Sequence, residues 1–319
     1  MDEEVQVDER AYSEVTKVEI KDEATQVDLT GGLYEAEILG VPKCMQIRRN
    51  QLVSEDPEIV LGRGSYGEVS FQTYQGMAVA VKKYKNCSKE EVARELLTVL
   101  NVRPHMFLPI VYGVSIERRP FLMISKFYGS LSTKRSTTLQ YYLKKYTRAD
   151  GNKDNPSGSL FPEVSISSKL PKNDRELLQV AENICEGLDH IHQSGYLHGD
   201  IKSNNILIIK YSCNIMPKII DFGKSCMINS PSYSCVTVKS EKDYENAKLK
   251  YPHMATEMFF GQPRSIKTDI YAYGMLLKEI LSALNKNNTD FKVLLEQALS
   301  DLPENRPALT CIKNVIANQ

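Results

Sequence analysis

Short apolar runs that alternate with polar residues occupy the first half of the chain. They surround Leu61-Gly62, cover Met77–Lys82, and recur at 107–114 and 121–127. A period of two places successive side chains on opposite faces of a strand. Because turn-forming residues separate the runs, the pattern predicts a small β-sheet over residues 55–125.

A helical period interrupts these strands once. Ser88-Lys89-Glu90-Glu91 has the form of a capping box, in which the Ser and Glu side chains bond each other's backbone N–H groups. Val92, Leu96 and Val99 follow at spacings of four and three, and Glu95 lies on the same apolar face. The sequence therefore predicts one helix beside the sheet, with a carboxylate on its inner side.

The second half of the chain is dominated by helical spacing. One helix is predicted from Asn173, an N-cap residue, to Gly195, and its apolar stripe is typical of core packing. Another is predicted to begin near Asp269. The two stripes are Leu177, Ala181, Ile184, Leu188 and Ile191 for the first helix, and Ile270, Tyr273, Leu277, Ile280 and Leu284 for the second.

Three segments lack either period. Residues 1–30 mix acidic residues with Lys, Thr and Val, which predicts a flexible acidic tail. Residues 31–54 form a lead-in segment. Residues 147–172 are rich in Asp, Asn, Gly, Ser and Pro, which predicts an exposed loop insertion.

The composition is that of an ordinary globular protein, and it excludes several classes of function. Lys plus Arg and Asp plus Glu number 40 each among 319 residues, so no net charge attracts nucleic acid. No run approaches about 18 apolar residues, which argues against membrane insertion. Seven Cys are scattered without a CxxC pair, which favours a reduced, cytoplasmic setting, with the nucleus left open.

Gly62, Gly64 and Gly67 belong to a GxGxxGxV pattern that also contains Ser65 and Val69. Glycines let backbone N–H groups approach a phosphate closely. Alone the pattern is weak, since a plain glycine hairpin has the same spacing. It lies between two strand-like segments and not ahead of a helix, which disfavours a dinucleotide-binding or P-loop interpretation.

Ala80 and Lys82 share one face of the next predicted strand because they are two residues apart. Ala80 leaves room for a flat base, and Lys82 can reach a phosphate. Taken alone, Lys82 fits an edge strand facing water, and Glu95 fits the solvated edge of its helix. Their occurrence together favours a Lys82–Glu95 pair, since a buried carboxylate without a cation costs several kcal/mol.

The segment His198–Asn205 gathers groups that suit phosphate chemistry. Asp200 can orient a hydroxyl, Lys202 can hold a phosphate, and Asn205 can bind a hard cation. Asp221, in Asp221-Phe222-Gly223, would complete a metal site. His198 fits a structural role better than that of general base, because the Asp already supplies one.

The order glycine loop, strand Lys, helix Glu, His-x-Asp loop and Asp-Phe-Gly resembles the catalytic domain of eukaryotic protein kinases over residues 55–315. Met254–Glu257 resembles the family's Ala-Pro-Glu segment, and Asp269–Gly274 resembles the start of its long central helix. Arg306 matches the family Arg that pairs with the Glu of that segment. Taken together, these motifs resemble those of the tyrosine-kinase-like group of Ser/Thr kinases.

The resemblance implies an α+β, bilobal fold: a β-rich N-lobe with one helix at 55–125, a hinge at 126–129 and a larger helical C-lobe at 130–315. It implies ATP and Mg²⁺ as cofactors and a protein as substrate. Asp200 and Lys202 would serve the transfer of the γ-phosphate, and Lys82, clamped by Glu95, would bind the α- and β-phosphates. Asn205 and Asp221 would hold Mg²⁺.

The family also implies where the nucleotide base lies. Val69, Ala80 and Leu207 would close on the adenine ring, and Lys126 and Tyr128 of the hinge would meet its edge. Ser125 would guard the back pocket. Lys202 resembles the loop of Ser/Thr-specific members, whereas Lys250 replaces a Thr common in them, so Tyr or dual specificity stays open.

Gly199 departs from the family pattern, because most members carry Arg there. In those members the Arg binds a phosphate on the activation segment, which corresponds here to Lys224–Thr256, so its absence predicts catalysis without such phosphorylation. His-Gly-Asp also resembles small-molecule phosphotransferases of the aminoglycoside and choline kinase type, although these lack the segment around Glu257. A nucleotide-binding pseudokinase is a third interpretation, against which stands the full set of catalytic residues.

Overall fold

The computed structural model describes residues 39–64, 67–148, 174–210, 214–230, 232, 236, 238–286 and 288–319. The predicted tail at 1–30 and nearly all of the predicted insertion at 147–172 lie outside these residues. The chain forms two compact units. The N-lobe comprises the described residues up to Leu100 and Ile110–Phe127, and the C-lobe comprises Asn101–Pro109, Tyr128–Lys210 and Asn214–Gln319.

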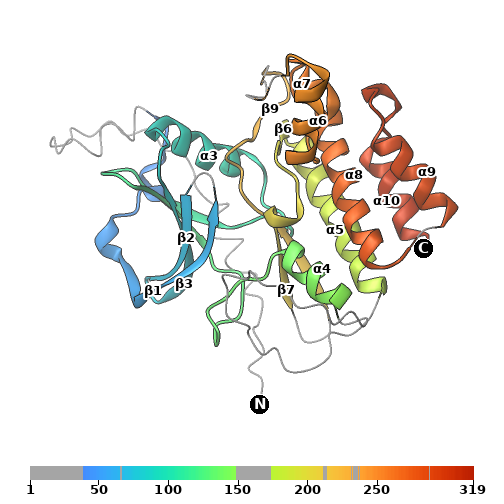
Figure 1. Ribbon diagram of the computed structural model, residues 1–319. Coiled ribbons are helices and arrows are strands. Elements are labelled where there is room, and N and C mark those ends of the chain that lie inside the picture. Colours follow the sequence, from blue (N-terminus) through green and yellow to red (C-terminus); the bar gives the residue numbers. More distant parts are fainter. Residues whose placement is uncertain are drawn as a thin grey trace. The chain divides into compact units, whose positions relative to one another are not determined.

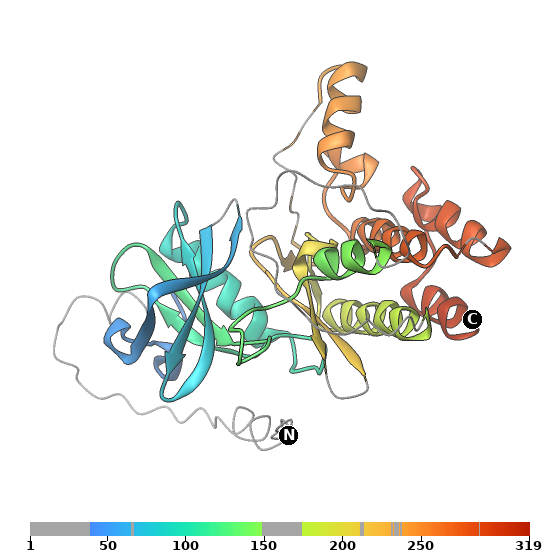
Figure 2. The ribbon, with the colours of Figure 1, turned by 60° about the horizontal axis from the view of Figure 1, so that its bottom comes forward.

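The N-lobe is built on a five-stranded antiparallel sheet with the order β1-β2-β3-β5-β4 (Figure 1). Figure 2 shows the twist of β1 to β3 across one another, as expected for strands of L-residues. Helix α3 is the one α-helix among the described residues of this lobe, and two 3₁₀ turns precede the sheet. The elements are η1 (Lys43–Met45), η2 (Arg49–Gln51), β1 (Leu52–Gly64), β2 (Gly67–Tyr74), β3 (Met77–Tyr84), α3 (Lys89–Asn101), β4 (Val111–Ser115) and β5 (Phe121–Lys126).

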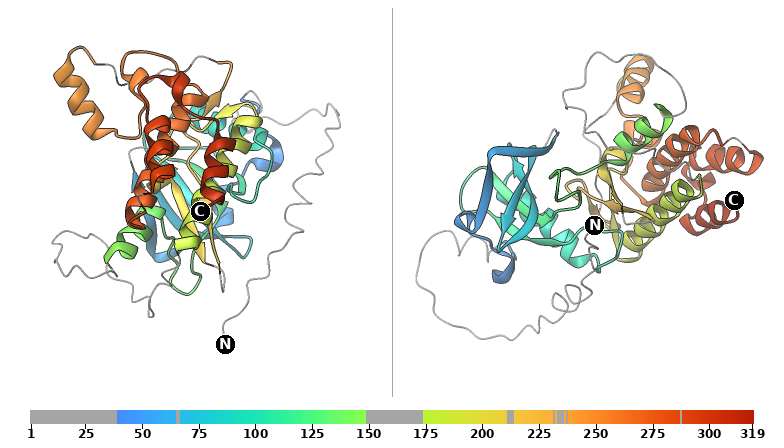
Figure 3. Two further views of the ribbon diagram at one scale, coloured as in Figure 1. Left: turned by 90° about the vertical axis from the view of Figure 1, so that its right-hand side faces the viewer. Right: turned by 90° about the horizontal axis from the view of Figure 1, so that it is seen from below.

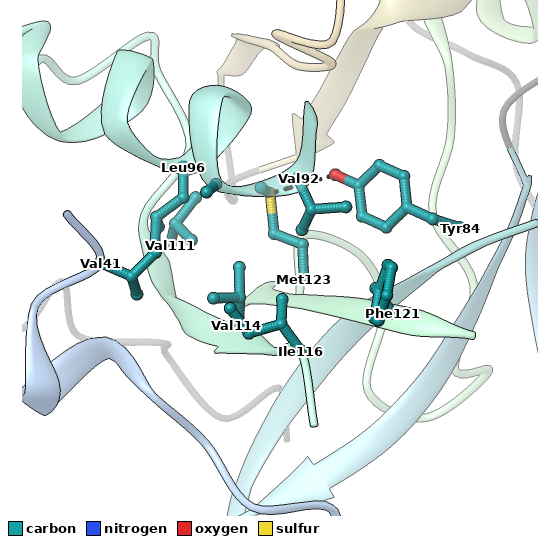
Figure 4. Close-up of a cluster of buried hydrophobic side chains, with 10 residues drawn as sticks. Val41, Tyr84, Val92, Leu96, Val111, Val114, Ile116, Phe121 and Met123 are labelled. Carbon is teal, nitrogen blue, oxygen red and sulfur yellow. Dashed lines mark hydrogen bonds between the residues drawn. The ribbon is translucent and has the colours of Figure 1, made fainter. Parts of the chain in front are cut away.

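Alternate side chains of β3 enter two different hydrophobic cores, one on each face of the sheet. Val79 and Val81 are fully buried on one face of the sheet, with Leu122 and Ile124 of β5. Tyr84 lies on the other face, where α3 packs (Figure 4). The members of that second cluster are Val41, Tyr84, Val92, Ala93, Leu96, Val111, Val114, Ile116, Phe121 and Met123.

The described part of the predicted lead-in segment, residues 39–54, takes part in the N-lobe core. Val41 and Ile47 are 2% and 3% exposed, and Ile47 N donates to Val114 O at 2.8 Å. Strand β1 also begins within the segment, at Leu52. Apolar residues at 41 and 47 are too few to produce a period, which is why the pattern alone did not reveal this.

The C-lobe is mainly helical, with two short β-ladders. Helices α5, α8 and α10 lie side by side in both views of Figure 3. The pairs β6-β9 and β7-β8 are antiparallel. The elements are α4 (Leu139–Arg148), α5 (Asp174–Gln193), β6 (Tyr196–Leu197), η3 (Ser203–Asn205), β7 (Ile206–Lys210), β8 (Ile215–Ile219), β9 (Cys226–Met227), α6 (Glu241–Lys250), α7 (Thr256–Phe259), α8 (Ile266–Ala283), α9 (Thr289–Ala298), η4 (Pro303–Asn305) and α10 (Leu309–Ala317).

The apolar stripe predicted for α5 is confirmed as core. All five of its residues are at most 1% exposed. Helix α8 begins at Ile266, three residues before the predicted start, because Ser265 and Thr268 form a capping box. The expected α+β fold, with a β-rich N-lobe and a larger helical C-lobe, is confirmed.

Two predicted boundaries differ from the structure. Helix α4 continues to Arg148, so Thr147 is helical and not the first residue of a loop; its hydroxyl donates to Leu143 O at 3.2 Å. Asn101–Pro109 belongs to the C-lobe although it falls within the predicted range 55–125. The buried Lys218 explains this, since its Nζ donates to Leu108 O at 3.2 Å.

Candidate functional site

The glycine pattern forms the hairpin between β1 and β2, in which Gly64 pairs with Gly67. A Cβ at residue 67 would lie 1.8 Å from Lys83 O, so no other residue fits there. A Cβ at Gly62 or Gly64 would meet nothing within 4 Å. These two glycines therefore leave open space beside the backbone, in which a side chain would also fit. Ser65 lies outside the described residues.

Lys82 and Glu95 form the predicted ion pair between β3 and α3. Lys82 Nζ lies 2.8 Å from Glu95 Oε1 and 3.0 Å from Oε2. The Glu95 side chain is 5% exposed and that of Lys82 is 17% exposed. Removing one member of a buried pair costs several kcal/mol, so each residue stabilises the position of the other.

Tyr84 supports this pair, and the sequence reasoning missed it. Its hydroxyl donates to Glu95 Oε2 at 2.7 Å, and Lys82 Nζ lies 4.8 Å from its ring centroid. In Figure 4 the same hydroxyl points toward Met123, whose sulfur lies 3.7 Å away. The period of two could have revealed it, because Tyr84 follows Lys82 by two residues on the same strand.

The pairing of the strands places two other predicted nucleotide-binding residues, Val69 and Ala80, on the face that carries Lys82. Val69 is directly opposite Lys82. Ala80 is opposite Ser125, whose hydroxyl donates to Ala80 O at 3.3 Å. Residues opposite each other in a ladder share a face of the sheet. A small residue, an aliphatic residue and an ammonium thus line one surface of the N-lobe.

The other predicted base-binding residues are distributed over the two units. Lys126 is exposed at the end of β5, and its N–H donates to Ile110 O at 2.9 Å. Tyr128 is buried in the C-lobe, where its carbonyl accepts from Ser136 Oγ at 2.7 Å. Leu207 is half-buried on β7. Their contact with an adenine ring stays a prediction.

Asp200 is the centre of a compact polar cluster in the C-lobe. Its side chain is 3% exposed. Oδ2 accepts from Lys202 Nζ at 2.7 Å and from Asn205 Nδ2 at 3.0 Å. Asn205 Nδ2 also lies 2.9 Å from Asp200 O. Three of the predicted site residues therefore meet at one carboxylate.

Two further side chains, an ammonium and an imidazole, reach the same carboxylate, and sequence reasoning missed both. Lys224 Nζ lies 2.8 Å from Asp200 Oδ1, and His253 Nε2 lies 3.4 Å from it. Burial would raise the pKa of Asp200, but the hydrogen bond from His253 and the ammonium groups of Lys224 and Lys202 outweigh it and hold this pKa below its ordinary value. Asp200 is therefore a carboxylate at neutral pH.

Asp269 holds the backbone of the loop before Asp200. Its oxygens accept from His198 N at 2.8 Å and from Gly199 N at 2.9 Å. The His192 ring also donates to it, at 3.0 Å. Burial would raise the pKa of Asp269, and these donors instead lower it. The sequence marked Asp269 only as the start of a helix, so this role was missed.

His198 has a structural environment. It is fully buried, its Nε2 lies 3.2 Å from Ile220 O, and its Nδ1 accepts from Asp200 N at 3.3 Å. Burial lowers the pKa of His198 although Asp269 is close to it. A neutral ring that donates through one nitrogen and accepts through the other satisfies both contacts.

Asn205 and Asp221 lie at one end of the β7-β8 ladder. Asn205 directly precedes β7, and its carbonyl accepts from Ile220 N at 2.9 Å, next to Asp221. Because Asn205 donates through its Nδ2, its Oδ1 is the atom that suits a cation. Asp221 has φ of 70°, a strained conformation for a residue with a side chain.

These two residues fit Mg²⁺. Within the described residues no three His, Cys, Asp or Glu side chains gather as metal ligands. A site with two protein oxygens is nevertheless typical of Mg²⁺, which takes its other ligands from phosphate and water. Asn205 and Asp221 are the residues that would hold it.

Glu257 and Arg306 form the pair that the resemblance implied. Arg306 Nη1 lies 2.6 Å from Glu257 Oε1, and Nη2 lies 2.7 Å from Oε2. Arg306 is 1% exposed, and its Nε also donates to Ser300 O at 2.9 Å. This two-pronged contact fixes the segment before α8 to the helical core.

Comparison with known proteins agrees with this arrangement. The chain is 26% identical to the human Tyrosine-protein kinase TXK over 225 aligned residues. The aligned region covers 70% of this chain and 35% of that protein. It is 27% identical over 228 residues to the Probable L-type lectin-domain containing receptor kinase S.5 of Arabidopsis thaliana, over 70% of this chain and 30% of that protein. A probable serine/threonine-protein kinase of Dictyostelium discoideum is 24% identical over 256 residues, 79% of this chain and 24% of its own length.

The chain thus spans about a third or less of the length of these relatives. No helix within the described residues is long and apolar enough to cross a membrane. The family model described as "Protein tyrosine and serine/threonine kinase" matches residues 57–316, which include the glycine hairpin, the Lys82–Glu95 pair, the Asp200 cluster and the Glu257–Arg306 pair. The chain therefore belongs to the protein tyrosine and serine/threonine kinase family.

Proposed function

We propose that this protein is an active kinase that transfers the γ-phosphate of ATP to Ser or Thr hydroxyls of a protein. The observation that carries the proposal is the Asp200 cluster, in which a buried carboxylate lies within 3.0 Å of Lys202 Nζ and Asn205 Nδ2. A base, a phosphate-binding cation and a metal ligand are the groups that phosphoryl transfer requires.

Each group has one task in this proposal. Asp200 orients the acceptor hydroxyl and takes up its proton. Lys202 neutralises charge that develops on the transferring phosphoryl group. Lys82, held by Glu95 and Tyr84, binds the α- and β-phosphates. Asn205 and Asp221 would hold Mg²⁺, which would supply charge neutralisation for the phosphates of ATP.

The lowered pKa of Asp200 is consistent with this role. A carboxylate surrounded by cations is a weak base, and its main effect is to align the hydroxyl for attack. Because phosphoryl transfer needs little proton removal before the transition state, alignment and charge neutralisation dominate the rate.

Lys202 supports Ser/Thr specificity, because its ammonium contacts Asp200 from within the same loop, at the position expected for that class. The relatives include a tyrosine kinase and a probable serine/threonine kinase, so family membership alone leaves the acceptor open.

A transfer assay with labelled ATP, Mg²⁺ and a generic protein acceptor tests the proposal. Wild-type protein should label the acceptor, and Asp200→Asn should not. Phosphoamino-acid analysis then identifies the acceptor residue. Phosphoserine and phosphothreonine are expected, and phosphotyrosine alone would contradict the proposed Ser/Thr specificity. ATP binding without labelling by either protein would favour the pseudokinase, and phosphorylation of small alcohols only would favour the small-molecule enzyme.

A further inference from the structure

Gly199 is crowded by two groups that a side chain would displace. Its φ is 76°, and a Cβ there would lie 2.6 Å from Lys224 O and 3.2 Å from Arg264 Nη1. Gly261 has nearly the same φ, 77°, and a Cβ there would meet nothing within 4 Å. Gly199 is therefore required for the space that it leaves as well as for its conformation.

Arg264 fills that space. It lies in the turn before α8, and its Nη1 donates to Lys224 O at 2.6 Å. Its backbone N–H donates to Ser232 O at 2.7 Å. One residue thus holds the chain after Asp221-Phe222-Gly223 at two points, Lys224 and Ser232.

The segment that Arg264 holds contacts the Asp200 loop directly. Lys224 Nζ lies 2.8 Å from Asp200 Oδ1. Ser225 is buried, and its Oγ donates to His198 O at 3.0 Å. A displacement of the Lys224 backbone would therefore shift groups that contact both His198 and Asp200.

We propose that Arg264 is a positioning residue that replaces the side chain missing at Gly199. The inference rests on the proposed function of Asp200 as the residue that aligns the acceptor hydroxyl. An Arg at position 199 would place a cation for a phosphate on the activation segment. Here the guanidinium comes from the turn before α8 and binds a neutral backbone carbonyl, for which no phosphate is needed. Gly199 and Arg264 act as one unit: the glycine provides the space and the arginine occupies it.

The first test compares two glycine substitutions with the same backbone strain. Gly199→Ala adds a Cβ against Lys224 O and Arg264, and Gly261→Ala adds one in open space. We expect kcat to fall about tenfold to a hundredfold in Gly199→Ala, because small misplacements near a reacting group have effects of this size. Gly261→Ala should stay within about threefold of wild type. Equal kcat in the two variants would overturn the proposal.

The second test removes the guanidinium with Arg264→Met in phosphatase-treated protein. Its matched control is Arg103→Met, which changes an exposed arginine of the C-lobe whose side chain has no hydrogen-bond partner among the described residues. We expect kcat to fall about tenfold or more in Arg264→Met while KM for ATP stays within about threefold, since nucleotide-binding groups are untouched. A rise in KM with unchanged kcat would contradict a positioning role.

Phosphatase treatment also decides whether Arg264 serves a phosphate. Wild-type protein should keep its kcat after treatment if the guanidinium binds only the Lys224 carbonyl. A loss of about a hundredfold would mean that a phosphate on the activation segment is needed, and it would overturn the proposal.

Hydrogen–deuterium exchange tests the contact without relying on transfer. Peptides that cover 196–205 and 222–230 should exchange faster in both Arg264→Met and Gly199→Ala than in wild type, Arg103→Met or Gly261→Ala, because local opening exposes their amides. Unchanged exchange in these peptides would overturn the proposal even in an active enzyme. Faster exchange in these two variants, combined with a wild-type protein that shows no transfer activity, would instead support the contact and refute the proposed function.

Discussion

The Lys82–Glu95 pair and the Asp200 carboxylate are both buried and both charged, yet they are stabilised in different ways. Glu95 faces one ammonium and one Tyr hydroxyl, contributed by β3. Asp200 faces two ammonium groups, an amide and an imidazole, which come from its own loop and from two later segments. The contacts described for Glu95 come from one strand, whereas those of Asp200 come from three segments of the chain.

This difference indicates where each lobe is vulnerable. A pair between one strand and one helix fails when either member is removed, because the remaining charge stays in an apolar core. A carboxylate with several donors keeps its charge when one donor is lost. Single substitutions in the N-lobe pair are therefore expected to lower stability as well as nucleotide binding, whereas those of the donors to Asp200 should act mainly on rate.

Asp200→Asn should have the largest effect of all. The amide keeps the shape of the side chain but loses the negative charge that aligns the acceptor hydroxyl and later takes up its proton, so kcat should fall by about 10²–10⁴. Steady-state kinetics with saturating ATP measures the change. A fall of less than about tenfold would mean that another group aligns the acceptor hydroxyl.

Lys82→Met should destabilise the N-lobe more than any single substitution of a donor to Asp200. It leaves Glu95 in the core without an ammonium, at a cost of about 3–5 kcal/mol in the free energy of unfolding. Urea denaturation measures that cost, and Lys83→Met on the same strand is the matched control, since the contact of Lys83 with Glu58 is more exposed. Similar losses of unfolding free energy in Lys82→Met and Lys83→Met would contradict the prediction that the Lys82–Glu95 pair contributes more to stability than the Lys83–Glu58 pair.

Tyr84→Phe should have a smaller effect in the same place. It removes one hydrogen bond to a charged group, worth about 1.5–3 kcal/mol, while the ring and its packing against Met123 remain. The same denaturation experiment applies. No loss of stability would mean that the Lys82 ammonium alone satisfies Glu95.

Lys224→Met should change the rate only modestly. Lys202 and Asn205 still contact Asp200, so kcat should fall by less than about tenfold. Lys202→Met is the comparison variant. It removes the ammonium proposed to contact the phosphate, so its kcat should fall further than that of Lys224→Met. The reverse order would exchange the roles of the two lysines.

The smallest effect concerns pH. The folded-state pKa of Asp200 is lowered, so its carboxylate stabilises the fold above its unfolded pKa, about 3.9, and this contribution is lost as pH falls through that value toward the folded pKa. Its slope cannot exceed about 1.4 kcal/mol per pH unit. Between pH 5 and pH 3 the unfolding free energy of wild type should fall more steeply than that of Asp200→Asn. Parallel slopes would contradict the lowered pKa.

The sequence predicted those features that depend on a repeated spacing. The strands, the stripe of α5 and the Lys82–Glu95 pair all follow from periods of two or of three and four. The Glu257–Arg306 pair followed from resemblance to a family, since 49 residues separate the two and no period connects them.

Sequence reasoning could not predict contacts that depend on the path of a loop. Lys224, His253 and Arg264 lie in irregular or short segments, and their meeting around Asp200 and Gly199 depends on long-range contacts. Asn101–Pro109 belongs to the C-lobe for a similar reason, because the buried Lys218 on β8 donates to a carbonyl of this segment.

The contact between Asp269 and the N–H groups of His198 and Gly199 has a consequence for how the loop can change. Both acceptors bind main-chain atoms, which every residue except proline provides. The hydrogen bonds that hold the catalytic loop to Asp269 of α8 therefore do not depend on the side chain at position 199. Two separate constraints therefore act on this loop: Asp269 fixes its main chain whatever residue stands at position 199, whereas the space beside Lys224 and Arg264 decides which residue that position accepts.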